Sequence, residues 1–198
     1  MIGADWRQVK GTDDTFELVI VRKDKDPGLQ GVFYTFPDAK EYSTKDIFRR
    51  HPTLPNQWLH VGRTDDLINF SFGLFLNPVV FENTISDHPD IKGVLVAGTN
   101  RFEPALLLEP ENVISTEGER ERLIDSVWPL VDRVNEQTVS YARVNRNFIR
   151  ITDPDKPFPR ASKGSIQRGA ALKLYEKFID NIYEKEEPSV GKQLVDKH

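Results

Sequence analysis

The first third of the chain alternates short runs of β-branched and aromatic residues with turn-forming residues. Such runs predict strands at Phe16–Arg22, Gly31–Phe36, Thr44–Phe48 and Trp58–Val61. The pair Pro27-Gly28 predicts a turn between the first two runs. This spacing is typical of one wall of a sheet or barrel, so we expect this third of the chain to be β-rich.

The pattern changes after a polar turn at Arg63–Asp66. A short hairpin with Gly73 near its tip is expected first. The pair Asn77-Pro78 then predicts the start of a short amphipathic helix that ends at about Asp87. Asparagine caps free backbone N–H groups, and proline suits the first helical position.

The rest of the chain predicts further strands and helices. They are two buried strands, a long helix, a short strand, a loop and a last helix, at Ile91–Ala97, Ala105–Glu109, Thr116–Val134, Phe148–Ile151, Asp153–Lys163 and Ser165–Ile182. Thr116 and Glu119 form a capping box for the long helix, which Pro129 is expected to kink. The polar residues from Glu184 predict a fraying tail.

These patterns predict an α+β protein with two parts. Residues 1–64 make the β-rich segment, residues 65–186 a smaller unit of sheet and helices, and residues 187–198 a polar tail. We place the boundary inside the Arg63–Asp66 turn, because the pattern of apolar residues changes there.

Composition narrows the function only slightly. The 198 residues carry a formal net charge of −4, which gives no general reason to expect nucleic acid or an anionic membrane as a partner. The chain has no cysteine, which excludes disulfides, thiolate metal sites and cysteine nucleophiles. Its first residues lack the apolar core of a signal peptide, and no run is long enough to cross a bilayer. We therefore expect a cytoplasmic protein.

Three ordered motifs carry a resemblance to a known family. They are Gly62-Arg63-Thr64-Asp65-Asp66, Leu76-Asn77-Pro78 and His88-Pro89-Asp90-Ile91-Lys92-Gly93. Together they resemble the hinge region of adenylate-forming (AMP-binding) enzymes, in particular the adenylation domains of fungal nonribosomal-peptide-synthetase-like (NRPS-like) enzymes. The resemblance covers nearly the whole chain. It implies that residues 1–64 end a large adenylation domain and that the rest is its small C-terminal lid.

The resemblance implies a nucleotide-binding role for Asp46. In the family, a Thr-Gly-Asp-Leu motif supplies an aspartate that accepts hydrogen bonds from both ribose hydroxyls of ATP. The sequence here is Thr44-Lys45-Asp46-Ile47, with Lys45 in place of the glycine. A carboxylate suits a vicinal diol because it offers only acceptors. The alternative is an aspartate that ends an exposed strand.

Arg63 and Asp65 follow in the hinge motif. The resemblance implies that Arg63 lies near the ribose or phosphate and that Asp65 is the hinge about which the lid rotates. A guanidinium beside a nucleotide is physically sensible because it is permanently charged and donates in a fixed fork. The alternative for both residues is a surface salt bridge in a polar turn.

The third implied site is the stretch Pro159-Arg-Ala-Ser-Lys-Gly-Ser-Ile-Gln-Arg168. It resembles the superfamily loop Pro-Arg-Thr-x-x-Gly-Lys-Ile-x-Arg, whose lysine stabilises charge while the acyl-adenylate forms. Gly164 and Arg168 match that loop, but Ser165 occupies the lysine position and Lys163 lies two residues earlier. We assign the catalytic role to Lys163. The alternative is a basic loop that caps the last helix.

Two other features of the sequence, an acidic stretch with a histidine and a set of arginines, could suggest a metal site and RNA binding. The stretch Asp87–Asp90 could be drawn as a metal site, but its place after a helix favours a turn, and we predict no metal site. The arginines Arg143, Arg146, Arg150, Arg160 and Arg168 could suggest RNA binding, yet no RNA-binding signature accompanies them. A solvated face, or a docking patch for an acidic carrier domain, is the preferred interpretation.

The resemblance implies a two-step reaction in an intact enzyme. A carboxylic acid attacks the α-phosphate of ATP, with Mg²⁺, and the lid then turns so that a phosphopantetheine carrier domain takes the acyl group. The triphosphate-binding loop, the residue that stacks on adenine and most of the acyl pocket have no counterpart in this sequence. We therefore expect a C-terminal portion of such an enzyme, with no tightly bound cofactor and no turnover alone. The alternative is a stand-alone, non-catalytic module that binds a carrier domain or another protein.

Overall fold

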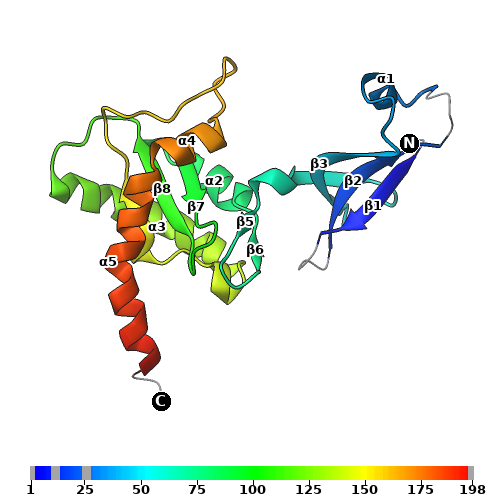
Figure 1. Ribbon diagram of the computed structural model, residues 1–198. Helices are drawn as coiled ribbons and strands as arrows, with labels where there is room; N and C mark the ends of the chain where they lie inside the picture. The colour runs from blue at the N-terminus through cyan, green and yellow to red at the C-terminus, as the bar shows by residue number, and fades with distance from the viewer. Residues whose placement is uncertain (1–2, 10–13, 24–27, 196–198) are drawn as a thin grey trace. The chain divides into compact units, whose positions relative to one another are not determined.

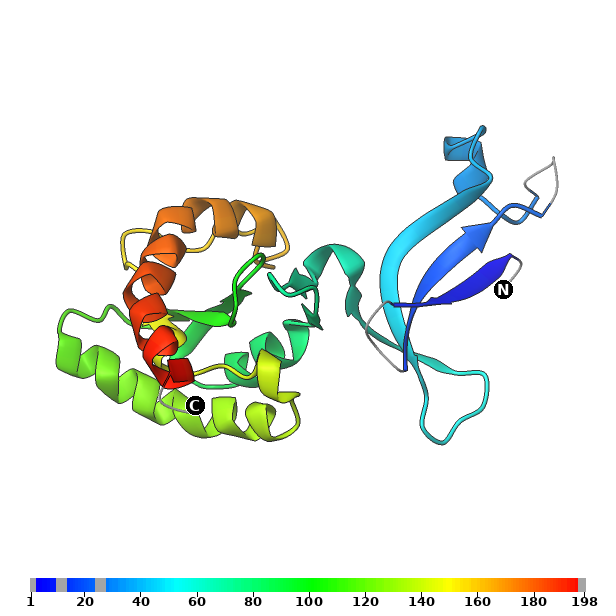
Figure 2. The same cartoon turned by 60° about the horizontal axis from the view of Figure 1, so that its bottom comes forward.

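The computed structural model describes the backbone of residues 3–9, 14–23 and 28–195 and the side chains of these residues as far as residue 185. The chain divides into two compact units, Met1–Leu67 and Ile68–His198. The division lies just after the Arg63–Asp66 turn. Figure 1 draws both units, and Figure 2 shows them turned by 60°. Each unit has a sheet of its own and is described by itself.

The first unit is built on a four-stranded antiparallel sheet in the order β1-β2-β3-β4. Its strands are β1 (Ala4–Gln8), β2 (Thr15–Val21), β3 (Glu41–Arg50) and β4 (Trp58–Arg63). The strands predicted at the positions of β2, β3 and β4 are confirmed. Strand β1 lies outside the predicted strands because its sequence carries a single large apolar residue, Trp6. The Trp6 ring stacks on Trp58 with the ring centroids 3.8 Å apart.

The strand predicted at Gly31–Phe36 is wrong, because Val32–Thr35 forms a single helical turn, α1. The β-branched and aromatic composition favours a strand, but Phe33 is the buried residue of this turn. Arg22 lies over the Phe33 ring, 4.4 Å from its centroid. This tertiary contact overrides the local preference. Of the predicted Pro27-Gly28 turn, Pro27 lies outside the described residues and Gly28 is in a turn.

The second unit joins a small hairpin to a three-stranded sheet with helices, which confirms the α+β class. Its main elements are β5 (Ile68–Asn69), β6 (Phe75–Leu76), α2 (Val79–Ser86), β7 (Ile91–Ala97), β8 (Ala105–Pro110), α3 (Glu117–Glu136), β9 (Ile149–Ile151), α4 (Arg168–Leu174) and α5 (Glu176–Val195). In the sheet, β7 pairs antiparallel and β9 parallel with the central strand β8. The predicted hairpin, the first helix and these three strands are confirmed.

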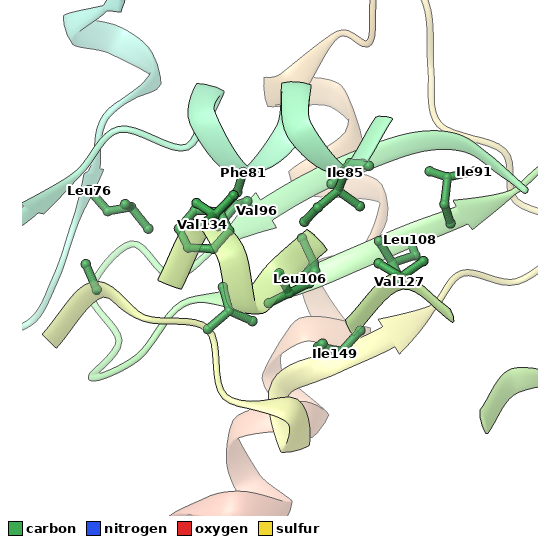
Figure 3. Packing of buried hydrophobic residues seen from close by; sticks show 14 of the residues in the cluster. Leu76, Phe81, Ile85, Ile91, Val96, Leu106, Leu108, Val127, Val134 and Ile149 are labelled. Atoms are coloured by element: carbon green, nitrogen blue, oxygen red, sulfur yellow. The ribbon is translucent and has the colours of Figure 1, made fainter. Parts of the chain in front are cut away.

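One face of this sheet packs against α2 and α3. Figure 3 shows Phe81 and Ile85 of α2 meeting side chains of the sheet and of α3. Leu106 and Leu108 of β8 alternate with residues of the opposite face, as side chains along a strand do. In β7, a register shift after Ile91 offsets this alternation, so the cluster takes Ile91, Val94 and Val96. The residues labelled in Figure 3 are Leu76, Phe81, Ile85, Ile91, Val96, Leu106, Leu108, Val127, Val134 and Ile149.

The opposite face packs against α4 and α5. The intervening strand residues form this second cluster, including Leu95 of β7 and Leu107 of β8. Tyr175 and Tyr183 bring the helices onto them. The sheet is therefore the middle of three layers, between α3 on one side and α5 on the other (Figure 2).

The helix starts follow the predicted chemistry. The Asn77 side chain accepts a hydrogen bond from the N–H of Val79 (3.1 Å) at the start of α2. The capping box of Thr116 and Glu119 is present at the start of α3. Backbone N–H groups of Thr116 and Ser115 donate to the Glu119 carboxylate, which lowers its pKa.

The last predicted helix differs from the structure at both ends. It begins at Arg168 rather than at Ser165, because residues 160–166 form a small hairpin. It is interrupted at Tyr175, and α5 then continues to Val195, past the expected fraying point at Glu184. Glutamate and lysine are good helix formers, so a polar sequence does not by itself end a helix.

Candidate functional site

Asp46 and Arg63 face each other across strands β3 and β4. They are register partners in the antiparallel pair. Nη1 of Arg63 donates to Oδ1 of Asp46 at 3.0 Å, and its Nη2 donates to Oδ2 of Asp65 at 3.3 Å. Asp65 lies in the short 3₁₀ turn η1 (Thr64–Asp66), which directly follows β4. The structure thus brings together all three residues that the sequence proposed for the nucleotide and the hinge.

This group lies at the surface and can reach a ligand. The side chains of Asp46, Arg63 and Asp65 are 36%, 44% and 56% exposed. Exposed ion pairs of this kind add little to stability. Within the described residues, Oδ2 of Asp46 accepts no hydrogen bond, so one carboxylate oxygen is open while Arg63 fixes the other.

The acidic residues around Arg63 favour its charged form. Its hydrogen bond to Asp65 raises its pKa, and the charges of Asp46, Asp65 and Asp66 add to the increase. Sequence analysis missed His60, whose Nε2 lies 3.8 Å from Oδ1 of Asp46. Strict alternation along β4 would put His60 and Arg63 on opposite faces of the sheet. A register shift in the pairing of β3 with β4, where Ile47 pairs with Gly62 and Phe48 with His60, brings His60 near the same carboxylate.

A bulge in β3 sets the direction of Asp46. The pairing with β2 shifts register at this point, so residues 44–46 lie opposite one residue of β2. The Thr44 hydroxyl donates to the Leu18 carbonyl oxygen (2.8 Å) and accepts from the N–H of Asp46 (3.1 Å). Lys45, between them, has φ of +66°, a left-handed conformation that favours glycine. The lysine thus stands at the position where the family motif has glycine.

Lys163 lies at the tip of a small hairpin. Arg160 and Ile166 form an antiparallel bridge, and the N–H of Ala161 donates to the Ser165 carbonyl oxygen (2.9 Å). Gly164 takes a φ of +87° in the turn, where glycine costs least. Lys163 is exposed at this tip, in the second unit, whereas Asp46 and Arg63 belong to the first.

Two ion pairs fasten the hairpin at its base. On one side, Arg160 binds Glu109 through both carboxylate oxygens, at 3.2 Å and 2.6 Å. On the other, Arg168 binds Glu82 of α2 and also the Val96 carbonyl oxygen of β7. Sequence analysis missed both glutamates. A charged residue at the end of the apolar run Ala-Leu-Leu-Leu-Glu was the available signal for Glu109.

The Asp87–Asp90 stretch and the arginines considered for RNA binding make local contacts in the structure. Nδ1 of His88 accepts from the N–H of Asp90 (3.2 Å), which closes a turn after α2. Arg160 and Arg168 lie in the partly buried ion pairs described above, and Arg146 pairs with Asp125 on α3. The arginines therefore serve separate contacts.

Comparison with known proteins assigns the family. A family model described as the AMP-binding enzyme C-terminal domain matches residues 65–187. The chain belongs to this family. The resemblance stated from the hinge motifs is thereby confirmed.

The relatives of this chain are much longer proteins, of which it covers only a small part. The carboxylic acid reductase of Neurospora crassa is 48% identical over 197 residues, which are 100% of this chain and 19% of that protein. The isocyanide synthase–NRPS hybrid crmA of Aspergillus fumigatus is 36% identical over 189 residues, covering 96% of this chain and 11% of that protein.

A solved structure has the same fold. It is the A-PCP didomain of carboxylic acid reductase from Segniliparus rugosus in complex with AMP, with a TM-score of 0.65 and 19% identity. The match covers 98% of this chain and 29% of that chain. No helix within the described part of this chain is long and apolar enough to cross a membrane.

We predict that Lys45→Gly stabilises the first unit by about 1 kcal/mol, because glycine adopts a left-handed φ without the Cβ penalty. The measurement is urea unfolding followed by near-ultraviolet circular dichroism of the stacked Trp6–Trp58 pair. Lys45→Ala is the matched control, because it removes the same side chain but keeps the strained backbone. Equal stability of the two variants would show that the backbone of residue 45 is unstrained.

Proposed function

We propose that this chain is the C-terminal portion of an enzyme that uses ATP to activate a carboxylic acid as an acyl-adenylate. The observation that carries the proposal is the gathering of Asp46, Arg63 and Asp65 immediately before, and at the start of, the AMP-binding C-terminal domain. An acceptor and a fixed donor beside a domain boundary suit a nucleotide site that a mobile domain closes. On this proposal the chain has no turnover alone.

Asp46 binds the ribose, and Arg63 orients the Asp46 carboxylate. The open Oδ2 of Asp46 accepts from a ribose hydroxyl, while the bond from Arg63 holds the carboxylate in place. The guanidinium also has donors left over for an anionic oxygen of the nucleotide. The AMP in the didomain structure of carboxylic acid reductase supports a nucleotide as the ligand.

Lys163 stabilises the negative charge that develops when the carboxylate attacks the α-phosphate. Its exposed position at a hairpin tip suits an ammonium group that must enter a site formed with other parts of an enzyme. Ser165, which occupies the usual lysine position of the motif, lies on the returning side of the same hairpin. We therefore assign the lysine role to Lys163.

Asp65 is the hinge about which the C-terminal domain turns between the two half-reactions. Its position in a short 3₁₀ turn, at the first residue matched by the family model, supports this role. Distances between spin labels on the two units, measured with and without an acyl-adenylate analogue, test it. An unchanged distance distribution would contradict the hinge.

The intact enzyme uses ATP with Mg²⁺, a carboxylic acid and a phosphopantetheine carrier domain, and it works in the cytoplasm. The names of the relatives, a carboxylic acid reductase and an A-PCP didomain, support the acid and the carrier. The described residues contain no group of three or more His, Cys, Asp or Glu that could hold a metal ion.

The chain offers a direct test because it aligns along its whole length with the Neurospora crassa carboxylic acid reductase. In a hybrid, this chain replaces the 197 aligned residues of that enzyme. We expect the hybrid to reduce carboxylic acids and to catalyse acid-dependent ATP–pyrophosphate exchange. The same enzyme without the segment, and the 198-residue chain alone, serve as inactive controls. A folded hybrid without exchange would overturn the proposal and favour a non-catalytic binding module.

We predict that Asp46→Asn raises the KM for ATP of the hybrid by about tenfold or more, because a hydrogen bond to a charged group contributes about 1.5–3 kcal/mol. Pyrophosphate exchange at varied ATP measures the effect. Asp38→Asn, an exposed aspartate of the same unit, is the control for the loss of one charge. An equal effect of both variants would exclude the ribose role.

Lys163→Ala should lower kcat of the exchange reaction by about 100-fold, the usual loss when a group that stabilises transition-state charge is removed. Transfer of a preformed acyl-adenylate to the carrier should change much less, because that step does not require charge stabilisation at the attack on the α-phosphate. Ser165→Ala is the comparison within the same hairpin. A silent Lys163→Ala beside an impaired Ser165→Ala would show that the lysine is wrongly assigned.

A further inference from the structure

The link between Arg160 and Glu109 at the hairpin that carries Lys163 includes the most deeply buried carboxylate of the two ion pairs described above. The Glu109 side chain is 6% exposed and that of Arg160 is 23% exposed. Besides its two bonds to Glu109, Arg160 donates to the carbonyl oxygens of Lys92 (3.2 Å) and Phe158 (3.1 Å). One guanidinium thus joins the hairpin to both β7 and β8.

Gly93 makes room for this contact. It is the register partner of Glu109 in the antiparallel pair. A Cβ at this position would lie 2.8 Å from the Glu109 carboxylate, 2.9 Å from Nη2 of Arg160 and 3.1 Å from Cδ1 of Ile166. The first two distances are shorter than real Cβ contacts, so a side chain at position 93 would push the ends of the Glu109 and Arg160 side chains out of their present positions. The last residue of the His-Pro-x-Ile-x-Gly motif therefore has a steric purpose.

The geometry of the Arg160–Glu109 pair fixes the orientation of the Arg160 side chain more than it stabilises the fold. A buried ion pair is often no more stabilising than apolar residues of the same size. A guanidinium bound through both carboxylate oxygens, however, is fixed in its plane as well as in its position. Arg160 lies three residues before Lys163, at the base of the hairpin, so its orientation sets that of the tip.

We propose that the Arg160–Glu109 pair, packed against Gly93, is the contact that holds the Lys163 hairpin in the orientation in which Lys163 reaches the α-phosphate. Arg160, Glu109 and Gly93 are positioning residues, because they act through Lys163. This inference rests on the proposed function for the role of Lys163. The anchoring itself is independent of that function and is measurable in the 198-residue chain.

The decisive variant replaces both residues of the pair, Glu109→Leu with Arg160→Leu. Lys92, whose Nζ also lies 3.7 Å from Oε1 of Glu109, is half exposed and stays hydrated in this variant. Single changes such as Glu109→Gln leave a buried charge unpaired and should lower the urea midpoint of the second unit, whereas the double variant should recover it. The N–H groups of Ala161, Gly164 and Gln167 donate to the carbonyl oxygens of Ser165, Ala161 and Pro159, respectively, within the hairpin. We expect amide hydrogen exchange at these three residues to rise at least tenfold in the double variant despite the recovered stability. Unchanged exchange would overturn the proposal.

Activity of the hybrid separates positioning from stability. In the double variant, kcat of pyrophosphate exchange should fall by about 100-fold, as expected when a reacting group is displaced by about 1 Å. The KM for ATP should stay within about twofold. Recovery of kcat together with stability would overturn the proposal, because the pair would then have only a structural role.

Two matched controls isolate the contact. Glu111→Gln removes an exposed carboxylate two residues after Glu109 and should change neither hydrogen exchange nor kcat. Gly93→Ala should raise hydrogen exchange in the hairpin and lower kcat, as in the double variant. Gly118→Ala, with open space around the added methyl group, should change neither.

Failure of the two proposals is distinguishable. If Lys163→Ala is silent in the hybrid, the proposed role of the lysine fails while hydrogen exchange still reports on the anchor. If hydrogen exchange is unchanged in the double variant while Lys163→Ala is impaired, the role of Lys163 is supported and the positioning role of the Arg160–Glu109 pair is contradicted.

Discussion

The second unit depends on the burial of strand β8 on both of its faces. Leu106 and Leu108 turn toward α2 and α3, and Ala105 and Leu107 turn toward α4 and α5, and all four are 0% exposed. Because both faces are apolar, charged side chains fit only at the margins of the sheet. Glu109 stands at the end of β8, and Glu82 and Arg168 meet at the edge of β7. The core thus determines where the Lys163 hairpin can be fastened.

Much of this architecture could be predicted from the sequence because the apolar runs are long or well delimited. The run in β7 and the capping box before α3 each specify an element locally. The prediction failed where a few residues depend on distant partners. Val32–Thr35 has strand composition but forms a helical turn under Arg22. The start of α4 depends on pairing within the hairpin, which no periodicity reveals.

In the candidate site, too, some residues could be predicted from the sequence and others could not. Asp46, Arg63, Asp65 and Lys163 could be named from motifs, since a motif records residue types at fixed spacing. Their partners could not, because Glu109 and Arg160 are separated by 51 positions in the chain, a contact that only the tertiary structure brings about. Likewise, the bulge that turns Asp46 outward arises from the pairing of β3 with β2.

Strand β7 lies at the edge of its sheet, where backbone groups are open to another strand. At Val96 these groups are occupied, since its N–H donates to Glu82 and its C=O accepts from Arg168. A foreign strand would have to break this ion pair before it could extend the sheet. The ion pair that fastens the Lys163 hairpin therefore also shields the middle of this sheet edge from pairing with another strand.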